Sequence, residues 1–344
     1  MISRRTLLKV FGLLSYLLLS GDRTAPARFF SKARENKPPR LVENRFVGEG
    51  KALVSVAGGT DVLAVIKEAV GLIGGLSRLG VKGRSVLVKP NVVSGSPNPA
   101  TTNPEAVAAL VKLLYGEGAS KVYVGDMSAF ATLSTKRNMK RNGIMKAALD
   151  AGAEVIAFED YEWVEVELPD ASIVKKAYVT EWIYRTDLVI NLPVIKTHRS
   201  ADYSICMKNF IGCTHLKQRP YLIDASLWEE IVADFNRAYS PDLNIVDGTV
   251  SMIEGGPWSG TEARTNIIIA SGDRVAADAV GLGIIKSFGK WPMVTEKDVW
   301  EQKQIKRAIE AGVGRDKGGI RLIAGGGDGD FMELISRARA YAGL

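Results

Sequence analysis

Short apolar runs alternate with helix-like segments along most of this 344-residue chain, and this alternation restricts the fold more than any other feature. The runs have the length and composition of strands buried on both faces, and they lie at 53–56, 85–88, 121–124, 154–158, 187–191, 243–246 and 266–270. Segments with helical spacing separate them, at 61–79, 103–115, 138–151, 226–238 and 274–285. Buried strands joined by helices form parallel sheets with helices on both sides. The sequence therefore predicts a three-layer α/β fold with a mainly parallel sheet.

One stretch near 160–180 departs from this pattern. Residues 164–168 alternate between apolar and polar side chains, which is typical of a strand with one exposed face. We expect 173–179 to pair with it as a small antiparallel insertion. The tail from Thr295 is expected to be helical, with one short strand at 319–323.

The first residues have the features of a targeting segment. Arg4 and Arg5 lie in a sequence that resembles the twin-arginine export signal, and small residues near Ala27 offer a cleavage point. The apolar stretch between them, 10–19, is half as long as the roughly 20 residues that span a bilayer. We expect residues 1–27 to be a signal peptide that directs the protein out of the cytoplasm; an anchor that is never cleaved is the alternative. Residues 28–50 are then a linker or arm, and 51–344 a single α/β domain.

The charge of the chain does not indicate a nucleic-acid partner. The formal net charge is +7, but residues 1–27 contribute four basic side chains and one acidic, so 41 basic and 37 acidic residues remain after them. No later segment is a block of like charges or a basic run interleaved with aromatic residues. The only membrane contact that we expect is through the signal segment, if it is not cleaved.

Polar side chains follow four of the predicted strands. Ligands of open α/β sheets bind at the carboxyl ends of the strands, which lie on the same edge. Taken singly, such residues are more often turn or cap residues; four strand ends together predict a polar site. They carry Lys89 with Asn91, Asp126 with Ser128, Asn191 leading to Lys196 and His198, and Asp247.

Three of the lysines suggest a site for an anion. Lys89, Lys196 and Lys208, with the amide donors Asn91 and Asn209, could bind a carboxylate or a phosphate. Lysines that are crowded and partly buried would also have lowered pKa values and could act as bases. The alternative is a set of solvated surface charges, the usual state of lysine.

Both histidines and both cysteines of the sequence lie within residues 196–217, and this suggests a metal or iron–sulfur site. Imidazole and thiolate are common ligands of zinc and iron. The spacing matches no zinc or ferredoxin pattern, however. The alternative is a small buried cysteine and a hydrogen-bonded histidine, so the cofactor stays open. The candidate ligands are His198, Cys206, Cys213 and His215.

Several short motifs occur in an order that resembles the family called domain of unknown function 362. They are 87–91, 102–105, 125–126, 191–198, 207–209 with Gly212, and 247–248 followed by 254–255. The resemblance covers roughly 51–285. It implies eight signature positions, which have no established roles: Lys89, Asn91, Asp126, Lys196, His198, Lys208, Asn209 and Asp247. Some relatives carry a two-cluster ferredoxin segment. This sequence has no Cys-x2-Cys-x2-Cys run, so an iron–sulfur function is not carried over.

These observations support two hypotheses. The first is an exported enzyme, or a protein that holds a cofactor, acting on a small anionic substrate. The three lysines would bind the anion or serve as base, His198 would be an acid, base or ligand, and Asp126 and Asp247 would orient a lysine or bind metal. The second is an exported binding protein without catalytic activity, which captures an acidic ligand or a metal for a partner complex.

The export hypothesis predicts the effect of replacing Arg4 and Arg5 by Lys. The double variant should stay in the cytoplasm, because the export receptor recognises the paired guanidinium groups rather than charge alone. Cell fractionation and immunoblotting measure this. Undiminished appearance of the double variant outside the cytoplasm would show that the pair is not an export signal.

Overall fold

The structure is a computed structural model that describes residues 33–344. The signal expected at residues 1–27 lies outside this range. Within the described residues, no helix is both long and apolar enough to span a bilayer.

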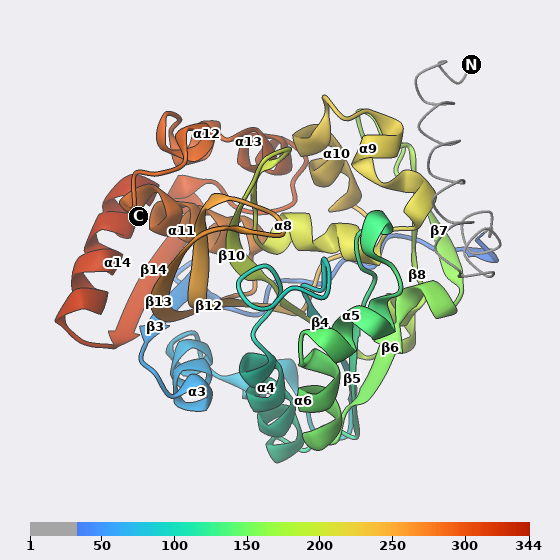
Figure 1. Cartoon of the computed structure of the whole chain (residues 1–344), viewed down its shortest axis with the longest axis horizontal. Helices are drawn as coiled ribbons and strands as arrows, with labels where there is room; N and C mark the ends of the chain where they lie inside the picture. The colour runs from blue at the N-terminus through green and yellow to red at the C-terminus, as the bar shows by residue number, and fades with distance from the viewer. Residues whose placement is uncertain (1–32) are drawn as a thin grey trace.

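The described residues form an α/β fold around one large, mainly parallel sheet of 11 strands (Figure 1). Eight strands follow one another across it, in the order β14 (Ile320–Gly326), β3 (Lys51–Gly58), β13 (Gly260–Ser271), β12 (Leu243–Gly255), β9 (Leu188–Leu192), β4 (Ser85–Pro90), β5 (Lys121–Asp126) and β6 (Glu154–Ala157). All of them run parallel except β13, which is antiparallel to both of its neighbours. Three short strands pair at the margins, β10 (Val194–His198), β11 (Asp202–Ser204) and β2 (Val47–Gly48).

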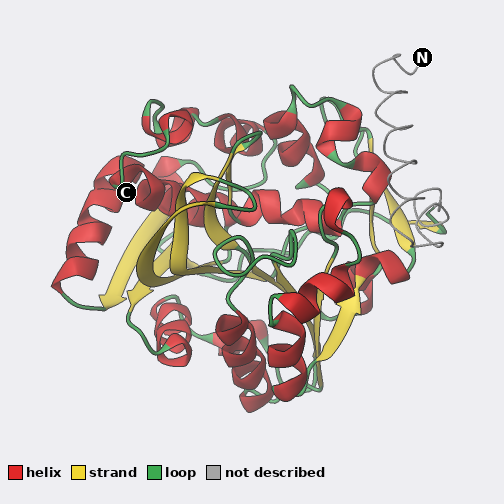
Figure 2. Cartoon of the chain, in the orientation of Figure 1, coloured by secondary structure: helices red, strands yellow, loops and turns green. Residues whose placement is uncertain are grey.

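Helices cover both faces of this sheet (Figure 2). On one face lie α3 (Val62–Leu72), α4 (Pro104–Gly116) and α6 (Ile144–Asp150), and on the other α8 (Cys206–Asn209), α10 (Trp228–Phe235), α11 (Arg274–Ser287) and α14 (Gly329–Ala342). Successive strand residues point to opposite faces, so Leu53 packs into one core and Val54 into the other. The three-layer arrangement predicted from the alternating pattern is therefore confirmed. The remaining helices are α5 (Thr135–Arg141), α7 (Trp182–Arg185), α9 (Pro220–Ile223), α12 (Pro292–Thr295) and α13 (Lys303–Glu310).

The segment near 160–180 forms the expected antiparallel pair, but in a sheet of its own. Strand β7 (Trp163–Glu167) pairs with β8 (Lys176–Thr180), and β1 (Glu35–Asn36) adds a third strand. The chain from Ala33 to Gly50 runs over the surface between this small sheet and the main one. Its Arg40 forms an ion pair of 3.0 Å with Asp242, just before β12.

Four elements differ from the sequence-based predictions. The helix expected over 138–151 is two helices, α5 and α6, because Gly143 adopts a φ of 89° between them. The helix expected over 61–79 ends at Leu72, before two glycines with positive φ. Strands β12 and β13 continue well beyond their predicted apolar runs, because they keep pairing with each other there and β10 pairs with β12 alongside.

A row of polar side chains crosses the buried sheet on the face of α8. Lys89, Asn191, Asn244 and Ser271 occupy paired positions on β4, β9, β12 and β13. The Asn191 amide donates to Asn244 Oδ1 at 3.0 Å, and Asn244 donates to the Ser271 carbonyl at 3.2 Å. Asn191 Oδ1 accepts a hydrogen bond of 2.8 Å from Asn209 of α8. Because buried polar groups must be hydrogen-bonded to be tolerated, this row fixes α8 relative to the strands.

Asn191→Ala tests the row. It should lower the free energy of unfolding by about 1–3 kcal/mol, because Asn244 Oδ1 would lose its donor and Asn209 Nδ2 its shortest acceptor inside the core. Urea denaturation followed by circular dichroism measures the loss. The matched control is Asn36→Ala on the exposed strand β1, which should change stability by no more than about 0.5 kcal/mol. Equal effects of the two variants would mean that the row does not stabilise the fold.

Candidate functional site

A cavity of about 410 Å³ lies at the carboxyl ends of β4 and β5, beneath β10 and α8. Charged and polar side chains form much of its lining, and they come from segments far apart in the sequence. They include Asn91, Asp126, Lys196, His198, Lys208, Asn209 and Arg219. Seven of the eight signature positions thus lie at or beside one cavity, counting Lys89, whose ammonium touches Asp126.

Lys89 supports the cavity from below and is fully buried. Its ammonium lies 2.6 Å from Asp126 Oδ1 and donates to Asn209 Oδ1 at 3.2 Å and to the Pro90 carbonyl at 3.0 Å. One ion pair and two hydrogen bonds therefore compensate for the burial of this ammonium. Gly212 leaves the space for this pair, since a Cβ atom there would lie 2.7 Å from Lys89 Nζ and still nearer to Asp126 Oδ1.

A chain of hydrogen bonds leads from this ion pair to Lys196. Asn209 Oδ1 also accepts from Asn91 Nδ2 at 2.9 Å, and Asn91 Oδ1 accepts from Lys196 Nζ at 2.9 Å. Lys196 donates a second hydrogen bond, of 2.6 Å, to the Ala100 carbonyl. This leaves one N–H of the ammonium for the cavity that Lys196 lines. Burial lowers the pKa of Lys196 well below its ordinary value, and the charges of Lys208 and Lys89 lower it further.

Lys208 is held by an aromatic ring rather than by a carboxylate. Its ammonium lies 4.5 Å from the centre of the Trp228 ring, a cation–π distance. Burial lowers the pKa of Lys208 to about 7, with contributions from the charges of Arg219 and Lys89. A lysine with this pKa is present as both ammonium and amine near neutral pH, so it can either attract an anion or accept a proton.

His198 stands beside Lys208 on the same tryptophan. Its ring centre is 5.6 Å from that of Trp228, and its Nδ1 accepts a hydrogen bond of 3.1 Å from the Ser200 amide. A ring nitrogen that accepts a hydrogen bond carries no proton, so the neutral ring has its proton on Nε2. Burial, followed by the charges of Lys208 and Lys196, lowers the pKa of His198 well below its ordinary value. This histidine is therefore a neutral hydrogen-bond donor at physiological pH.

Asp247 lies away from the cavity lining and inside β12, not at the end of the strand as the sequence suggested. Its Oδ2 accepts from the Asn103 amide at 2.7 Å and from Asn98 Nδ2 at 2.9 Å. Its Oδ1 accepts from both the amide and the hydroxyl of Thr249. These bonds hold the loop that carries Ala100, the acceptor of Lys196, so Asp247 shapes the site indirectly.

Asp278 of α11 is a site residue that the sequence did not single out. Its carboxylate accepts hydrogen bonds from the amides of Cys206 and Met207, at 2.6 and 3.3 Å, and so fixes the start of α8. Burial raises the pKa of Asp278 to about 7. A signal was present, since Asp278 is the one acid in an otherwise apolar helical run, 275–285. Arg219, Trp228 and Trp258 were also missed, and nothing in their local sequence marks them.

The four metal candidates have different neighbours. His198 lies beside Trp228, whereas His215 packs on Trp163 with ring centres 4.9 Å apart. Cys206 and Cys213 are buried, and burial raises the pKa of both thiols, that of Cys213 to about 12. In residues 33–344, no three His, Cys, Asp or Glu side chains are grouped so that they could hold a metal ion. The structure therefore does not bring these candidates together.

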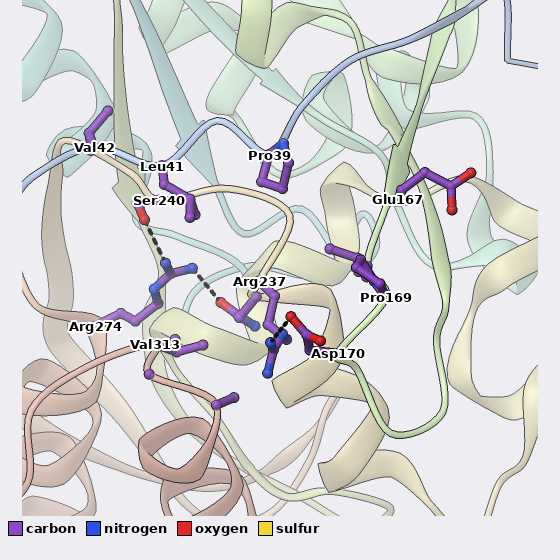
Figure 3. A pocket seen from close by; sticks show the side chains of 14 residues that line it. Pro39, Leu41, Val42, Glu167, Pro169, Asp170, Arg237, Ser240, Arg274 and Val313 are labelled. Atoms are coloured by element: carbon purple, nitrogen blue, oxygen red, sulfur yellow. Dashed lines mark hydrogen bonds and ion pairs between the residues drawn. The ribbon is translucent and has the colours of Figure 1, made fainter.

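A second cavity of about 410 Å³ lies between the surface arm near Leu41, the turn after β7, and the end of α10 (Figure 3). Its charged side chains are engaged with neighbours. Arg274 donates to Asn236 Oδ1 at 2.8 Å and to Ser240 Oγ at 3.0 Å, and Arg237 lies 3.8 Å from Asp170. None of the signature positions lines this cavity, so the first cavity is the candidate site.

Comparison with known proteins agrees with the family resemblance. The family described as domain of unknown function (DUF362) matches residues 86–283, which contain every residue of the candidate site named above. A thylakoid-associated protein, sll1697, from Synechocystis sp. is 27% identical over 233 residues, which is 66% of this chain and 70% of that protein. Among solved structures, the lactate racemase apoprotein from Thermoanaerobacterium thermosaccharolyticum aligns over 86% of this chain and 87% of its own. The TM-score is 0.39 and the identity 11%, a likeness too weak to carry fold or activity across.

The buried ion pair beneath the cavity gives a prediction for stability. Asp126→Asn should lower the free energy of unfolding by about 3–5 kcal/mol, because it leaves the Lys89 ammonium buried without its counterion. Lys89→Met combined with Asp126→Asn should recover at least half of that loss, since no unpaired charge remains. Urea denaturation of the three proteins measures this cycle.

The control is Asp150→Asn, which removes the partner of Lys146 in an exposed pair and should cost no more than about 1 kcal/mol. If the double variant is as unstable as Asp126→Asn alone, the charge of Lys89 is not what Asp126 compensates.

Proposed function

The chain belongs to the family described as domain of unknown function (DUF362), and we propose that it is an enzyme that acts on a small anionic substrate in this cavity. The observation that carries the proposal is a pair of lysines, Lys196 and Lys208, that have no carboxylate partner among the described residues. Within residues 33–344, Lys196 donates hydrogen bonds only to neutral oxygens, and the Lys208 ammonium lies over the Trp228 ring. Asp126, the carboxylate of the lining, is already paired with Lys89.

The charges acting on these lysines support this view. Those that act on Lys196 are Lys208, Asp126 and Lys89, two of them cations. Those that act on Lys208 are both cations. Buried like charges repel one another unless a counterion joins them. An anionic substrate would supply that counterion, with Lys196 donating its remaining N–H to it.

Lys208 and His198 are the residues that we propose for proton transfer. A lysine whose pKa lies near 7 is partly unprotonated at neutral pH, which suits a general base. A neutral histidine with its proton on Nε2 suits a donor to an oxygen that becomes negative. Lys89, Asn91, Asn209 and Asp126 would then hold these groups in place.

A binding protein without catalytic activity is the alternative. At neutral pH Lys208 can gain or lose a proton, which proton transfer uses and binding alone does not require. The lowered pKa therefore favours the enzyme. Metal analysis and an ultraviolet–visible spectrum of protein from its native compartment separate the two further, because a colourless, metal-free protein with a tightly held organic acid would support the binding protein.

We also propose that the protein acts outside the cytoplasm. This rests on the Arg4–Arg5 segment and the short apolar stretch after it.

The anion site predicts a change in thermal stability. Citrate, phosphate or sulfate should raise the melting temperature above that in chloride of equal ionic strength, because a ligand of the folded state stabilises it by mass action. Lys196→Ala and Lys208→Ala should remain folded and lose the gain. With sulfate, whose charge is constant over the range, the gain should be larger at pH 6 than at pH 8.5, since Lys208 loses its proton near pH 7.

Lys290→Ala, which removes an exposed lysine, is the control and should keep the full gain. If Lys196→Ala and Lys208→Ala also keep it, these lysines do not bind the anion. If no anion shifts the melting temperature of the unmodified protein, the proposed function is wrong.

A further inference from the structure

Apolar side chains form another part of the cavity lining, called here the apolar wall, and they bear on the kind of anion that the cavity takes. The members of this wall come from several separate stretches of chain, and some of them are large. They are Val93, Met127, Phe130, Ile211, Trp228 and Trp258. A site for a bare inorganic anion needs only charged groups and hydrogen-bond donors, so these apolar side chains call for a different ligand.

The size of the cavity leads to the same conclusion. At about 410 Å³ it lies within the roughly 300–1,000 Å³ typical of pockets for organic ligands. Acetate or sulfate would occupy a small part of it and leave the apolar wall in contact with water. A ligand with an apolar body would cover that wall and gain free energy from the surface removed from water.

Trp258 is the member of the apolar wall whose large side chain is not explained by packing in the core. It lies in the turn between β12 and β13, and its side chain is 48% exposed. The turn is nevertheless held in place. The Gly256 amide donates to the Ser259 carbonyl at 3.0 Å, and Gly256 approaches the Thr197 carbonyl so closely that a Cβ atom would not fit between them. The fold thus fixes the backbone of this turn against β10, next to His198, while leaving the indole open to solvent at the cavity.

Trp228 joins the apolar wall to the cations. Its ring contacts the Lys208 ammonium at 4.5 Å and lies near His198 while also lining the cavity. If the charged end of a ligand lies at Lys196 and Lys208, the part of the ligand next to that end therefore lies beside the Trp228 ring.

Resting on the proposed function, we propose that the substrate is a carboxylate with an apolar body about the size of a phenyl ring or a short branched alkyl chain, and that Trp258 determines this specificity. The carboxylate lies at Lys196 and Lys208, and the body lies against Trp228 and Trp258. Trp258 acts through binding of the apolar body and takes no part in the proton transfer.

Isothermal titration calorimetry of the full chain tests this with three probes: acetate, 3-phenylpropionate and 3-phenylpropionamide. We expect 3-phenylpropionate to bind at least roughly tenfold more tightly than acetate, the scale of discrimination by small apolar groups in a pocket. The amide should bind weakly, because it lacks the charge. Trp258→Ala should remove most of the preference for 3-phenylpropionate without weakening acetate, and Trp258→Phe should restore part of it.

Tyr341→Ala is the matched control, because Tyr341 is an aromatic residue of nearly equal exposure, 46%, on α14 and away from the cavity lining. It should keep the full preference. Equal binding of acetate and 3-phenylpropionate, or an undiminished preference in Trp258→Ala, overturns this inference. The proposed function survives that result if acetate still binds and Lys208→Ala abolishes the binding. Binding of none of the anions overturns both.

Discussion

The buried ammonium of Lys89 is the interaction on which the rest of the site depends. A full charge beneath a sheet edge is tolerated only if counterion and hydrogen bonds surround it. Asp126 supplies the counterion, and the Pro90 carbonyl and Asn209 supply the other acceptors. Each requirement fixes another element: β5 must end at Asp126, α8 must present Asn209, and residue 212 must lack a Cβ atom.

This saturated pair explains why the neighbouring lysines are different. Because Asp126 is paired with Lys89, the described residues of the cavity lining offer no second carboxylate to Lys196 or Lys208. Asn91 extends the hydrogen-bond network from Asn209 to Lys196 but does not neutralise Lys196, since an amide oxygen accepts a hydrogen bond and carries no formal charge. The chain therefore holds one lysine with a carboxylate counterion, Lys89, and beside it two lysines without one, Lys196 and Lys208.

The sequence predicted the layers of the fold and the edge of the sheet where the polar residues meet, because both follow from local periodicity and from strand direction. It did not predict which lysine is satisfied. That depends on Asp126 and Asn209, which are distant in sequence from Lys89, and on the space at Gly212. The sequence also predicted that Asp247 lies at the end of a strand, because an apolar run ends there, whereas β12 continues past it. Trp258 was beyond reach, because its place at the cavity comes from a turn pressed against β10.

The burial of Lys208 lowers the stability of the folded protein. Its pKa is about 7 in the folded protein, whereas an unfolded lysine titrates near 10.4. Between these values the unfolded chain binds more protons, so the contribution of Lys208 to the free energy of unfolding rises with pH across that window. Below pH 7 the full cost of burying its charge is present. An apolar residue at this position would avoid the cost, and a bound anion offsets it by restoring the proton and its partner together. The same burial that lowers stability lets Lys208 change its protonation state at neutral pH, and proton transfer to or from a bound anion requires such a group.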